Sequence, residues 1–514
     1  MGAVPWTVYA PTRRKKHWKL PQGLMWKKVE RKVKRLQMRI AKAAKNRQYR
    51  KMRSLQWILV HSYYGKLLAI RRVTSNKGKN TPGVDGVVWR TSRQKTRAVK
   101  QLKRRGYKAK PLRRVYIPKR PGKLRPLGIP TMHDRATQAL YALTIEPIAE
   151  TLADPNSYGF RIGRCCADAH VQCYIALAGR QCAPWILEAD IQSCFDEISH
   201  QWIMEHIPLD KTMLSSWLRA GYLDKGKLYP TLRGTPQGGI ISPLIMNMTL
   251  NGLESCAKKA APWYVPGTKQ RAGINVIRYA DDFVVTSKSR QVLEECVLPA
   301  IKAFLKERGL VLSKEKTRIV HIEEGFDFLG QKIGKYNGKF LITPTRKAMQ
   351  GLQAKIRQIL QEHKGGDVWS MIGRLNRTIT GWCNYHRHSC SSKAFNQFDS
   401  WLFWTIKYWL HQRHTNKRLR WIRKKYYRNA SGRQWTFYAV RKGNNGKKEY
   451  KDLVKAGRIH IIRHVKIRAK ANPFDPDWIN YFIKRSRMKK SSNRDSRFIE
   501  EHGWLHKESC LKSA

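Results

Sequence analysis

The sequence predicts an α+β chain, and three observations predict this class. Apolar residues recur at helical spacing before residue 100 and again after residue 344. Between these regions, residues 111–340 hold short β-rich runs mixed with helical stretches. Hydrophobic residues make up 41% of the 514-residue chain, which is enough for a folded core and about two to four domains.

The first hundred residues are expected to be basic and helical. Residues 1–24 suggest a flexible arm, and residues 80–86, Asn-Thr-Pro-Gly-Val-Asp-Gly, predict a turn-rich loop. Two amphipathic helices are predicted between them. Their apolar faces hold Val29, Val33, Leu36 and Ile40 in the first helix, and Met52, Leu55 and Leu59 in the second. The opposite faces are rich in Lys and Arg, which fits either a solvated surface or contact with RNA.

After residue 344 the spacing predicts a bundle of three helices. Gly365-Gly366 ends the first helix, and residues 368–388 form the second. The apolar positions are Leu352, Ile356 and Ile359 in the first helix, and Phe395, Phe398, Leu402, Ile406 and Trp409 in the third. From Trp421 the chain becomes a basic and aromatic tail, and the polar residues 488–497 predict disorder.

The charge of the chain indicates its partner. Lys and Arg total 103 against 35 Asp and Glu, a net charge of +68 that is spread along the whole sequence. Such self-repulsion is unusual in an enzyme of small metabolites, and a polyanion would relieve it by releasing counterions. The 18 Trp and 21 Tyr are interleaved with the basic residues, which suits base stacking beside phosphate contact. Nucleic acid is therefore the expected partner.

The sequence also carries signals of location. The ten Cys have no regular spacing, which predicts free thiols in a reducing compartment. The N-terminus lacks the apolar segment of a secretory signal, and no apolar run is long enough to span a membrane. The expected location is a reducing cytosol.

Three acidic residues are the candidate catalytic centre. Asp281 and Asp282 lie between two β-rich runs, so we expect a hairpin with both acids at its tip. Asp190 ends another apolar run, and the backbone carbonyl of Ile191 adds a possible metal ligand. Carboxylates on two neighbouring strands are what two-metal nucleotidyl transfer requires, and Mg²⁺ prefers such oxygen ligands. The alternative is a set of turn-forming or salt-bridged acids.

Three further motifs suggest a nucleotide site. The basic hairpin expected over residues 114–130 carries Lys119 and Arg125, which can reach a triphosphate. Phe195 follows Asp190 and can pack beneath the sugar, where it would exclude a 2′-hydroxyl. Gln237 lies in a glycine-rich turn before a helix and can hydrogen-bond a nucleotide or the template. The alternatives are a hairpin that touches only RNA backbone, a core aromatic and an ordinary loop.

The ordered blocks resemble the reverse transcriptases of bacterial and organellar group II introns. The matching blocks are residues 117–131 with Asp134-Arg135, 157–161, the strand ending at Asp190, 235–239, Tyr279-Ala-Asp-Asp282, 309–317 and 326–330. Ile162 replaces the usual Pro of the family. Outside these blocks, residues 80–86 resemble its N-terminal extension, 381–385 its thumb or maturase domain, and 463–476 its DNA-binding segment.

The resemblance implies a right-hand polymerase fold with four regions. These are a basic helical N-terminal extension (1–100), fingers and palm (101–343), a three-helix thumb or maturase domain X (344–420), and a basic DNA-binding region and tail (421–514). It implies an RNA-directed DNA polymerase that copies intron RNA into DNA during retrohoming. It also implies a maturase that binds the intron RNA and assists splicing.

Cofactors, partners and residue roles follow from the same resemblance. Two Mg²⁺ ions are expected, with Mn²⁺ as a substitute, and the partners are group II intron RNA, target DNA and dNTPs. No membrane partner is expected, and the oligomeric state stays open. The resemblance implies the cytoplasm of a bacterium, at the nucleoid when DNA is bound, although an organellar host stays open. The resemblance assigns metal binding to Asp190, Asp281 and Asp282, and nucleotide contact to Lys119, Arg125, Phe195 and Gln237. Lys316 is a candidate acid for pyrophosphate departure.

One departure and two alternatives complete the prediction. Many members of the family end in an HNH endonuclease with paired Cys, whereas this chain has no Cys-x-x-Cys pair. We therefore expect no nicking of the second strand, and a primer that comes from elsewhere, such as a replication fork. The alternative functions are a non-catalytic RNA-binding splicing cofactor and a reverse transcriptase domesticated by its host.

Overall fold

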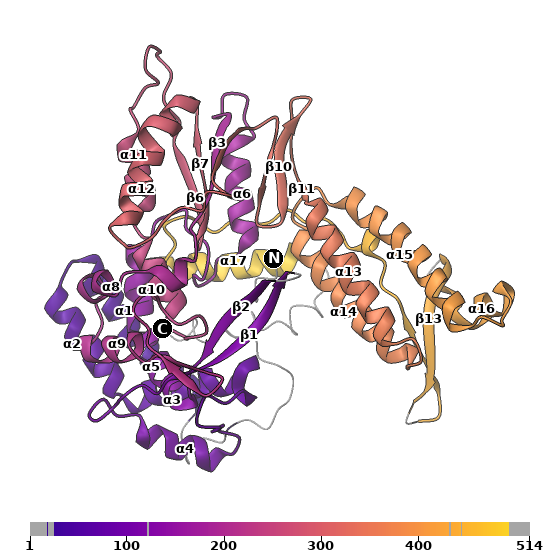
Figure 1. Ribbon diagram of the computed structural model, residues 1–514, viewed down its shortest axis with the longest axis horizontal. Helices are drawn as coiled ribbons and strands as arrows, with labels where there is room; N and C mark the ends of the chain where they lie inside the picture. The colour runs from indigo at the N-terminus through magenta and orange to yellow at the C-terminus, as the bar shows by residue number, and fades with distance from the viewer. Residues whose placement is uncertain (1–17, 19–24, 121–122, 431–432, 444, 493–514) are drawn as a thin grey trace. The chain divides into compact units, whose positions relative to one another are not determined.

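A computed structural model describes the chain except for residues 1–17, 19–24, 121–122, 431–432, 444 and 493–514. The expected N-terminal arm therefore lies outside the described residues, apart from Trp18. The chain divides into two compact units (Figure 1). Residues 321–464 form one unit, which we call the bundle unit. The described residues up to 320, together with those from 465 to 492, form the other, which we call the sheet unit.

The sheet unit begins with helices that pack around one central helix. Their bounds are α1 (Trp26–Lys45), α2 (Tyr49–His61), α3 (Tyr63–Ser75), η1 (Lys77–Asn80), α4 (Ser92–Gln101) and α5 (Met132–Leu152). The apolar faces predicted for the first two helices are confirmed, because Val29, Ile40 and Leu59 are fully buried. Helices α1, α2 and α3 all contact α5. Because α5 is buried along most of its length, it forms the centre of this helical layer.

Two four-stranded sheets follow in the sheet unit. The first has the order β6-β7-β3-β8 and the second β2-β1-β4-β5. The strands of the first are β6 (Asn275–Tyr279), β7 (Asp282–Ser287), β3 (Trp185–Asp190) and β8 (Arg318–His321). Those of the second are β2 (Lys123–Ile129), β1 (Leu112–Arg120), β4 (Tyr222–Asp224) and β5 (Lys227–Tyr229). The basic hairpin predicted over residues 114–130 is the β1–β2 pair.

Short helices connect and flank these sheets (Figure 1). Their bounds are α6 (Cys166–Leu177), α7 (Cys194–Glu197), α8 (His200–His206), α9 (Lys211–Leu218), α10 (Ser242–Thr249), α11 (Leu253–Ala260), the π-helical η2 (Val292–Val297) and α12 (Leu298–Lys306). Helices α6 and α11 both contact β6. The first sheet and the helices around it share one large apolar core.

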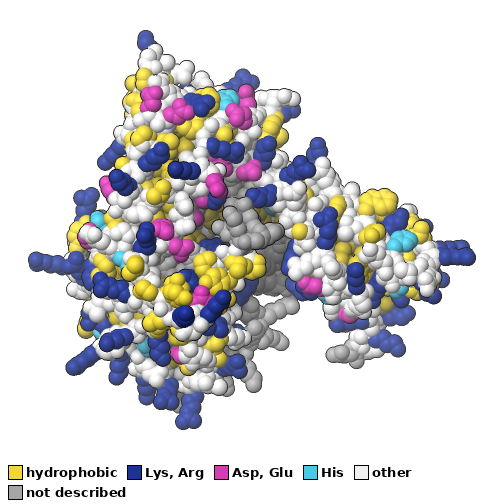
Figure 2. Space-filling model, viewed as in Figure 1, with side chains coloured by type: hydrophobic (Ala, Val, Ile, Leu, Met, Phe, Trp, Pro, Cys, Tyr) yellow, Lys and Arg dark blue, Asp and Glu magenta, His cyan; other side chains and the backbone are white. Residues whose placement is uncertain are grey.

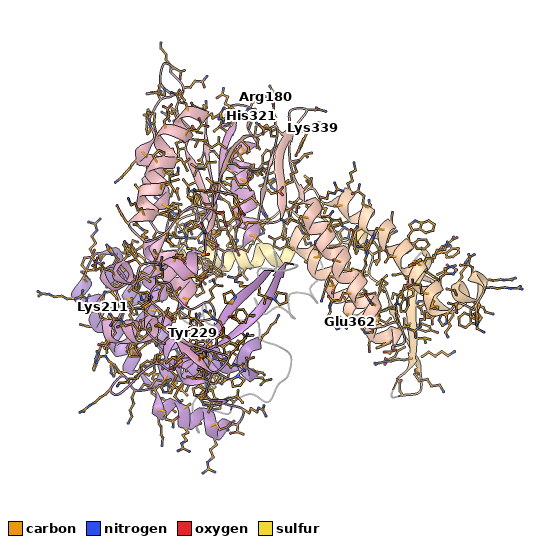
Figure 3. All side chains as sticks on the ribbon, in the orientation of Figure 1. Arg180, Lys211, Tyr229, His321, Lys339 and Glu362 are labelled. Atoms are coloured by element: carbon orange, nitrogen blue, oxygen red, sulfur yellow. The ribbon has the colours of Figure 1, made fainter. Side chains whose placement is uncertain are left out.

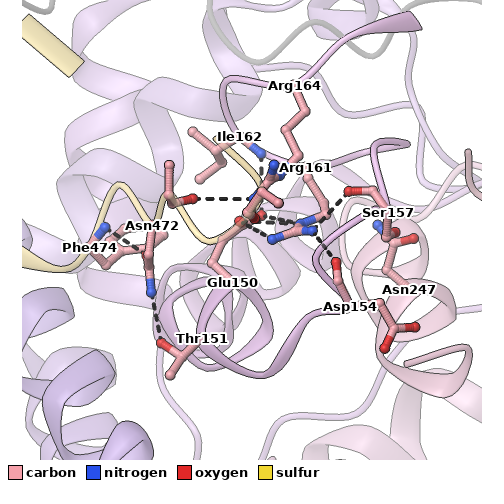
Figure 4. A network of polar contacts seen from close by, with 12 residues as sticks. Glu150, Thr151, Asp154, Ser157, Arg161, Ile162, Arg164, Asn247, Asn472 and Phe474 are labelled. Atoms are coloured by element: carbon pink, nitrogen blue, oxygen red, sulfur yellow. Dashed lines mark hydrogen bonds and ion pairs between the residues drawn. The ribbon is translucent and has the colours of Figure 1, made fainter. Parts of the chain in front are cut away.

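A buried polar network holds the loop after α5 (Figure 4). The Arg161 guanidinium lies 3.0 Å from the Glu150 carboxylate, and both side chains are 5% exposed. Arg161 also donates hydrogen bonds of 2.8 Å to the carbonyls of Asp154 and Ser157. Removing one member of a buried ion pair costs about 3–5 kcal/mol, so this network fixes the path of residues 154–161.

The C-terminal segment returns to the sheet unit. It contains η4 (Pro476–Trp478) and α17 (Ile479–Ser492). The guanidinium of Arg485 in α17 pairs with the buried carboxylate of Asp168 in α6 at 3.0 Å. The predicted disorder of residues 488–497 is wrong for 488–492, which continue α17. A helix anchored by packing at its first turns can extend through a polar sequence, and residues 493–497 lie outside the described residues.

The bundle unit contains the three predicted helices. They are α13 (Arg346–Glu362), α14 (Val368–His386) and α15 (Ser392–Arg413), preceded by the antiparallel sheet of β9 (Phe326–Phe328), β10 (Gln331–Tyr336) and β11 (Lys339–Pro344). Every apolar position predicted for the first and third helices is buried. Glu362, labelled in Figure 3, pairs with Arg374 at 2.7 Å and joins α13 to α14 at the surface.

The region after Trp421, for which the sequence predicted only a basic and aromatic tail, is folded. It forms α16 (Leu419–Tyr426) and an antiparallel sheet of β12 (Tyr427–Ala430), β13 (Arg433–Lys442) and β14 (Lys448–Asp452), followed by η3 (Ala456–Arg458). Phe437 and Ala439 are buried in the core of the bundle unit. Their alternation with more exposed residues is the period-two signal of a strand, which the high density of Lys and Arg obscured.

Candidate active site

The two adjacent acids lie in a hairpin, as the sequence predicted. Strands β6 and β7 pair antiparallel with Tyr279 opposite Asp282, so Ala280 and Asp281 form a two-residue turn. Ala280 has a φ of 62°, the left-handed conformation that the favoured two-residue turns require. Such a conformation costs a residue other than glycine about 1–2 kcal/mol. We call this turn with its flanking strands the acidic hairpin.

The third acid meets the acidic hairpin through strand register. Strand β3 pairs antiparallel with β7, and Asp190 lies opposite Asp282. The N–H of Ile191 donates to the carbonyl of Asp281 at 3.2 Å. The structure therefore brings Asp190, Asp281 and Asp282 to the same end of two neighbouring strands, and Ile191 directly follows Asp190.

Burial and mutual repulsion dominate the electrostatics of the three acids. Burial raises the pKa of Asp281, and the charge of Asp190 raises it further. Burial and the charges of both other acids hold the pKa of Asp282 well above its ordinary value. A cation bound between them would relieve this repulsion. Because the available donors are all oxygen, the set fits a hard divalent cation such as Mg²⁺.

One lysine supplies positive charge to the acids. The Nζ of Lys316 lies 2.5 Å from Oδ2 of Asp190, and its charge acts to lower the pKa values of Asp281 and Asp282. The N–H of Ser313 donates to the carbonyl of Asp190 at 2.8 Å, which holds the Lys316 loop against β3. Lys316, which the sequence suggested as a proton donor, is thus in direct contact with the site formed by Asp190, Asp281 and Asp282, which we call the acidic site.

A buried arginine that sequence reasoning missed supports the acidic hairpin. Arg278 is 1% exposed and donates hydrogen bonds of 3.3 Å to the carbonyl of Ala280 and the Asn247 side chain. A third bond of 3.2 Å reaches Asn251, and Asp154 lies 3.8 Å away. Burial lowers the pKa of Arg278 to about 10. In a chain this basic, one more Arg within a β-rich run gave no signal of its role.

The segment over residues 157–161 packs against the same turn. A Cβ atom at Gly159 would lie 2.4 Å from the backbone nitrogen of Ala280, so only glycine permits this approach. The ring of Phe160 meets that of Phe195 edge-on at 6.2 Å. Phe195 is half-buried against the apolar core, so it is both a packing residue and accessible on one side.

Gln237 joins three parts of the sheet unit. Its Nε2 donates to Oδ2 of Asp196 at 2.6 Å, and its Oε1 accepts from Nε of Arg125 at 2.7 Å. Its backbone carbonyl accepts from the N–H of Gly128 in β2 at 2.8 Å. The structure therefore brings Arg125 and Gln237 together. Lys119 lies in β1, but its side chain is outside the described residues.

Basic and aromatic side chains lie side by side on the surface of the protein. Lys and Arg are spread over the face of each unit that Figure 2 shows. In the bundle unit, Lys407 lies 4.8 Å from the ring of Trp404, and Arg423 lies 3.5 Å from that of Trp435. Both Trp side chains are exposed, at 62% and 40%. Paired aromatic and cationic groups of this kind bind bases and phosphates together.

Comparison with known proteins places each of these regions. The family model described as "Reverse transcriptase (RNA-dependent DNA polymerase)" matches residues 117–333. The "N-terminal domain of reverse transcriptase" matches residues 21–102, and the "Group II intron, maturase-specific domain" matches residues 349–427. The first match contains Asp190, Asp281 and Asp282, and the last covers most of the helical bundle.

Individual relatives agree with these matches. Protein YkfC of Escherichia coli is 33% identical over 308 residues, which cover 53% of this chain and 81% of the relative. The group II intron-encoded protein LtrA of Lactococcus lactis is 28% identical over 423 residues, covering 64% and 70%. Maturase-like protein 1 of Euglena gracilis is 23% identical over 377 residues, covering 72% and 78%.

The fold and the site together define a right-hand polymerase of the reverse transcriptase class, with α+β architecture. The chain belongs to the family of group II intron-encoded reverse transcriptases that carry a maturase domain. It is accordingly an RNA-directed DNA polymerase and maturase that depends on a divalent metal and binds RNA.

Two remaining observations complete the comparison. A solved structure of telomerase from Candida albicans in complex with a fragment of telomeric RNA aligns at a TM-score of 0.35 and 13% identity. It covers 60% of this chain and 59% of that one, a likeness too distant to carry an argument. Among the described helices, none combines the length and apolar character needed to cross a bilayer.

Proposed function

We propose that this protein copies group II intron RNA into DNA during retrohoming, and that it binds the same RNA to assist splicing. The observation that carries the proposal is the register of the sheet unit. Asp190 faces Asp282 across adjacent antiparallel strands, and Asp281 lies in the turn beside them. Three carboxylates in this arrangement match the needs of two-metal nucleotidyl transfer.

Asp190, Asp281 and Asp282 would hold two Mg²⁺ ions, with the carbonyl of Ile191 as a further ligand and Mn²⁺ as a substitute. Bound Mg²⁺ supplies activation of the primer 3′-hydroxyl and neutralises the charge of the leaving pyrophosphate. The raised pKa values of Asp281 and Asp282 support this assignment, because burial and mutual repulsion both disfavour ionised acids that no cation neutralises.

The remaining residues would bind and orient the dNTP. Arg125 and Lys119 bind the triphosphate, for which the guanidinium of Arg125 offers bidentate geometry. The half-buried ring of Phe195 packs beneath the sugar and excludes a 2′-hydroxyl, and Gln237 hydrogen-bonds the nucleotide. Lys316, already 2.5 Å from Asp190, donates a proton to the departing pyrophosphate.

The partners and regions are proposed on the same basis. The bundle unit contains the match to the maturase-specific domain, and its exposed Trp residues beside Lys and Arg support binding of the intron RNA. We assign an N-terminal extension to residues 1–100, fingers and palm to 101–343, a thumb or maturase domain to 344–420 and a DNA-binding region to 421–514. Target DNA would bind the last region, in a bacterial cytoplasm.

Primer extension on an RNA template with dNTPs and Mg²⁺ tests the proposal. The natural protein should make DNA, whereas Asp281→Asn should make none above background. Asp224→Asn is the matched control, because Asp224 lies on β4 and its carboxylate accepts a hydrogen bond from Tyr116. Intron RNA binding, measured in parallel, should be equal in all three proteins. Loss of extension without loss of RNA binding would separate catalysis from the maturase role.

Absence of extension by the natural protein, together with tight binding of intron RNA, would contradict the polymerase role. That result would favour the alternative of a splicing cofactor without catalysis.

A further inference from the structure

The segment after β3 and the loop around Gln237 form one hydrogen-bonded unit. The N–H of Thr235 donates to the carbonyl of Phe195 at 2.6 Å, and the N–H of Gly234 donates to that of Ile198 at 2.8 Å. A Cβ atom at Gly234 would lie 2.4 Å from the carbonyl oxygen of Asp196. The two segments are therefore held at backbone contact distance, and side chains on them keep a fixed relation.

The same loop is fastened to the β1–β2 hairpin. A Cβ atom at Gly238 would lie 2.3 Å from the carbonyl oxygen of Gly128, and Gly238 has a φ of 126° that favours glycine. Together with the bond from the N–H of Gly128 to the carbonyl of Gln237, this approach fixes the loop against β2, which carries Arg125.

Asp196 decides how the amide of Gln237 is oriented. A carboxylate accepts hydrogen bonds and does not donate them, so Oδ2 of Asp196 selects the NH₂ end of the amide. The carbonyl end then faces Arg125 and accepts from its Nε. Burial raises the pKa of Asp196, while Arg114 and Arg125 oppose that shift and favour the ionised form.

The guanidinium of Arg125 gains its position from this chain of bonds. Nε is used by Gln237, and within the described part of the chain neither Nη group has a hydrogen-bond partner. Arg125 also acts to lower the pKa of Asp281, so it lies within electrostatic range of the acidic site. An Arg side chain that is otherwise exposed loses rotamer freedom in this contact before any ligand binds.

We propose that Asp196 is a positioning residue for the incoming nucleotide, acting through the Gln237 amide to hold Arg125 ready for the triphosphate. The inference rests on the proposed function, because it assumes that Arg125 and Gln237 meet the dNTP. It assigns to Asp196 no contact with the reacting atoms. Its effect falls on nucleotide binding and leaves the chemical step unchanged.

Single-nucleotide incorporation with Asp196→Asn tests the inference. An asparagine can present either end of its amide, so the orientation of Gln237 is no longer fixed. We expect the KM for dNTP to rise roughly tenfold or more, because a hydrogen bond to a charged group is lost. The kcat and the thermal unfolding midpoint should stay close to those of the natural protein. A merely structural role would lower the midpoint and kcat together.

Two further variants sharpen the test. Glu197→Gln is the matched control, because the carboxylate of the neighbouring Glu197 pairs with the exposed Arg233 at 2.9 Å. This variant should leave KM unchanged. In the background of Gln237→Met, adding Asp196→Asn should raise KM no further, because Asp196 acts through Gln237. Should Asp196→Asn fail to fold, Asp196→Glu keeps the charge, displaces the acceptor and should give an intermediate KM.

An unchanged KM in folded Asp196→Asn or Asp196→Glu would overturn the inference and leave the proposed function intact. Additive effects in the double variant would also overturn it. A natural protein that incorporates no nucleotide would overturn both the inference and the proposed function.

Discussion

The acidic hairpin and the three-helix bundle are two regions of one chain built in opposite ways. The bundle is held by apolar residues that recur at helical spacing within α13, α14 and α15. The acidic hairpin is held by groups distant in sequence, such as Arg278 with Asn247 and Asp154. The bundle gains stability from many apolar contacts, whereas the hairpin brings three acids together despite their mutual repulsion. We therefore expect that substitutions at the acids of the hairpin abolish catalysis without unfolding the protein, whereas substitutions in the apolar core of the bundle unfold it.

The largest effect should come from the acidic site. Asp190→Asn removes one carboxylate from the set that binds metal, and we expect a loss of primer extension of at least about a thousand-fold. The unfolding midpoint should change little, because Asp190 is only half-buried and its partner Lys316 is exposed. Extension assays and thermal unfolding on the same sample would check this. A large drop in the unfolding midpoint would contradict the expectation that Asp190 serves catalysis without stabilising the fold.

The bundle should show the reverse pattern. Phe398 is fully buried between the helices of the bundle unit, and Phe398→Ala should cost about 3–5 kcal/mol through lost burial and the cavity it leaves. Denaturant unfolding monitored by hydrogen exchange should show that the loss of stability lies in residues 321–464. Phe403→Ala, at a partly exposed position of the same helix, is the control and should cost far less. Equal losses in both variants would refute the predicted bundle core.

Substitution of Arg278 tests whether a buried residue that supports the acidic hairpin affects mainly catalysis, as the acids do, or mainly stability, as core residues do. Arg278→Lys keeps a charge near Asp154 but cannot donate to Ala280, Asn247 and Asn251 at once. We expect roughly a ten- to hundred-fold loss of kcat and a raised Mg²⁺ concentration for half-maximal activity. Metal titrations of extension rate would check this. An unchanged metal requirement would show that Arg278 contributes only to the stability of the fold and not to metal binding.

The smallest effect concerns pH. The pKa of Asp282 in the folded protein lies well above its ordinary value. In the absence of metal, protonation of Asp282 therefore stabilises the folded protein. This stabilisation is complete at pH values below the pKa of Asp282 in the unfolded chain, and it is lost as the pH rises through the higher pKa of Asp282 in the folded protein. At neutral pH, Asp282→Asn should raise the unfolding midpoint in chelator by on the order of 2 °C. For the natural protein, the metal requirement should grow as pH falls, because protons compete for the carboxylates.

Unfolding scans between pH 5 and 8, with and without Mg²⁺, would measure both effects. Added Mg²⁺ should raise the midpoint of the natural protein and leave that of Asp282→Asn nearly unchanged. Equal stabilisation of both proteins by Mg²⁺ would contradict metal binding at Asp282.

Local sequence determined much of this protein. Helical periodicity was enough to predict α1, α2 and the bundle, because each helix buries residues three or four positions apart. The hairpin around Asp281 was predictable for a similar reason, since two β-rich runs flank a short turn. The order of the blocks was also enough to identify the family. The sheet β12–β14 was missed because its alternation is weak among so many Lys and Arg.

Tertiary structure decided how the charges are held. Nothing local relates Arg278 to Asn247, Asp196 to Gln237, or Lys316 to Asp190, since each pair is separated by at least 31 residues. A buried or half-buried ionisable group needs partners, and a strand can present any distant residue at the required register. The sequence by itself determined which groups are available for chemistry. Only tertiary structure decided which of them meet: the pairing of β3 with β7 placed Asp190 opposite Asp282, and other long-range contacts joined the remaining pairs.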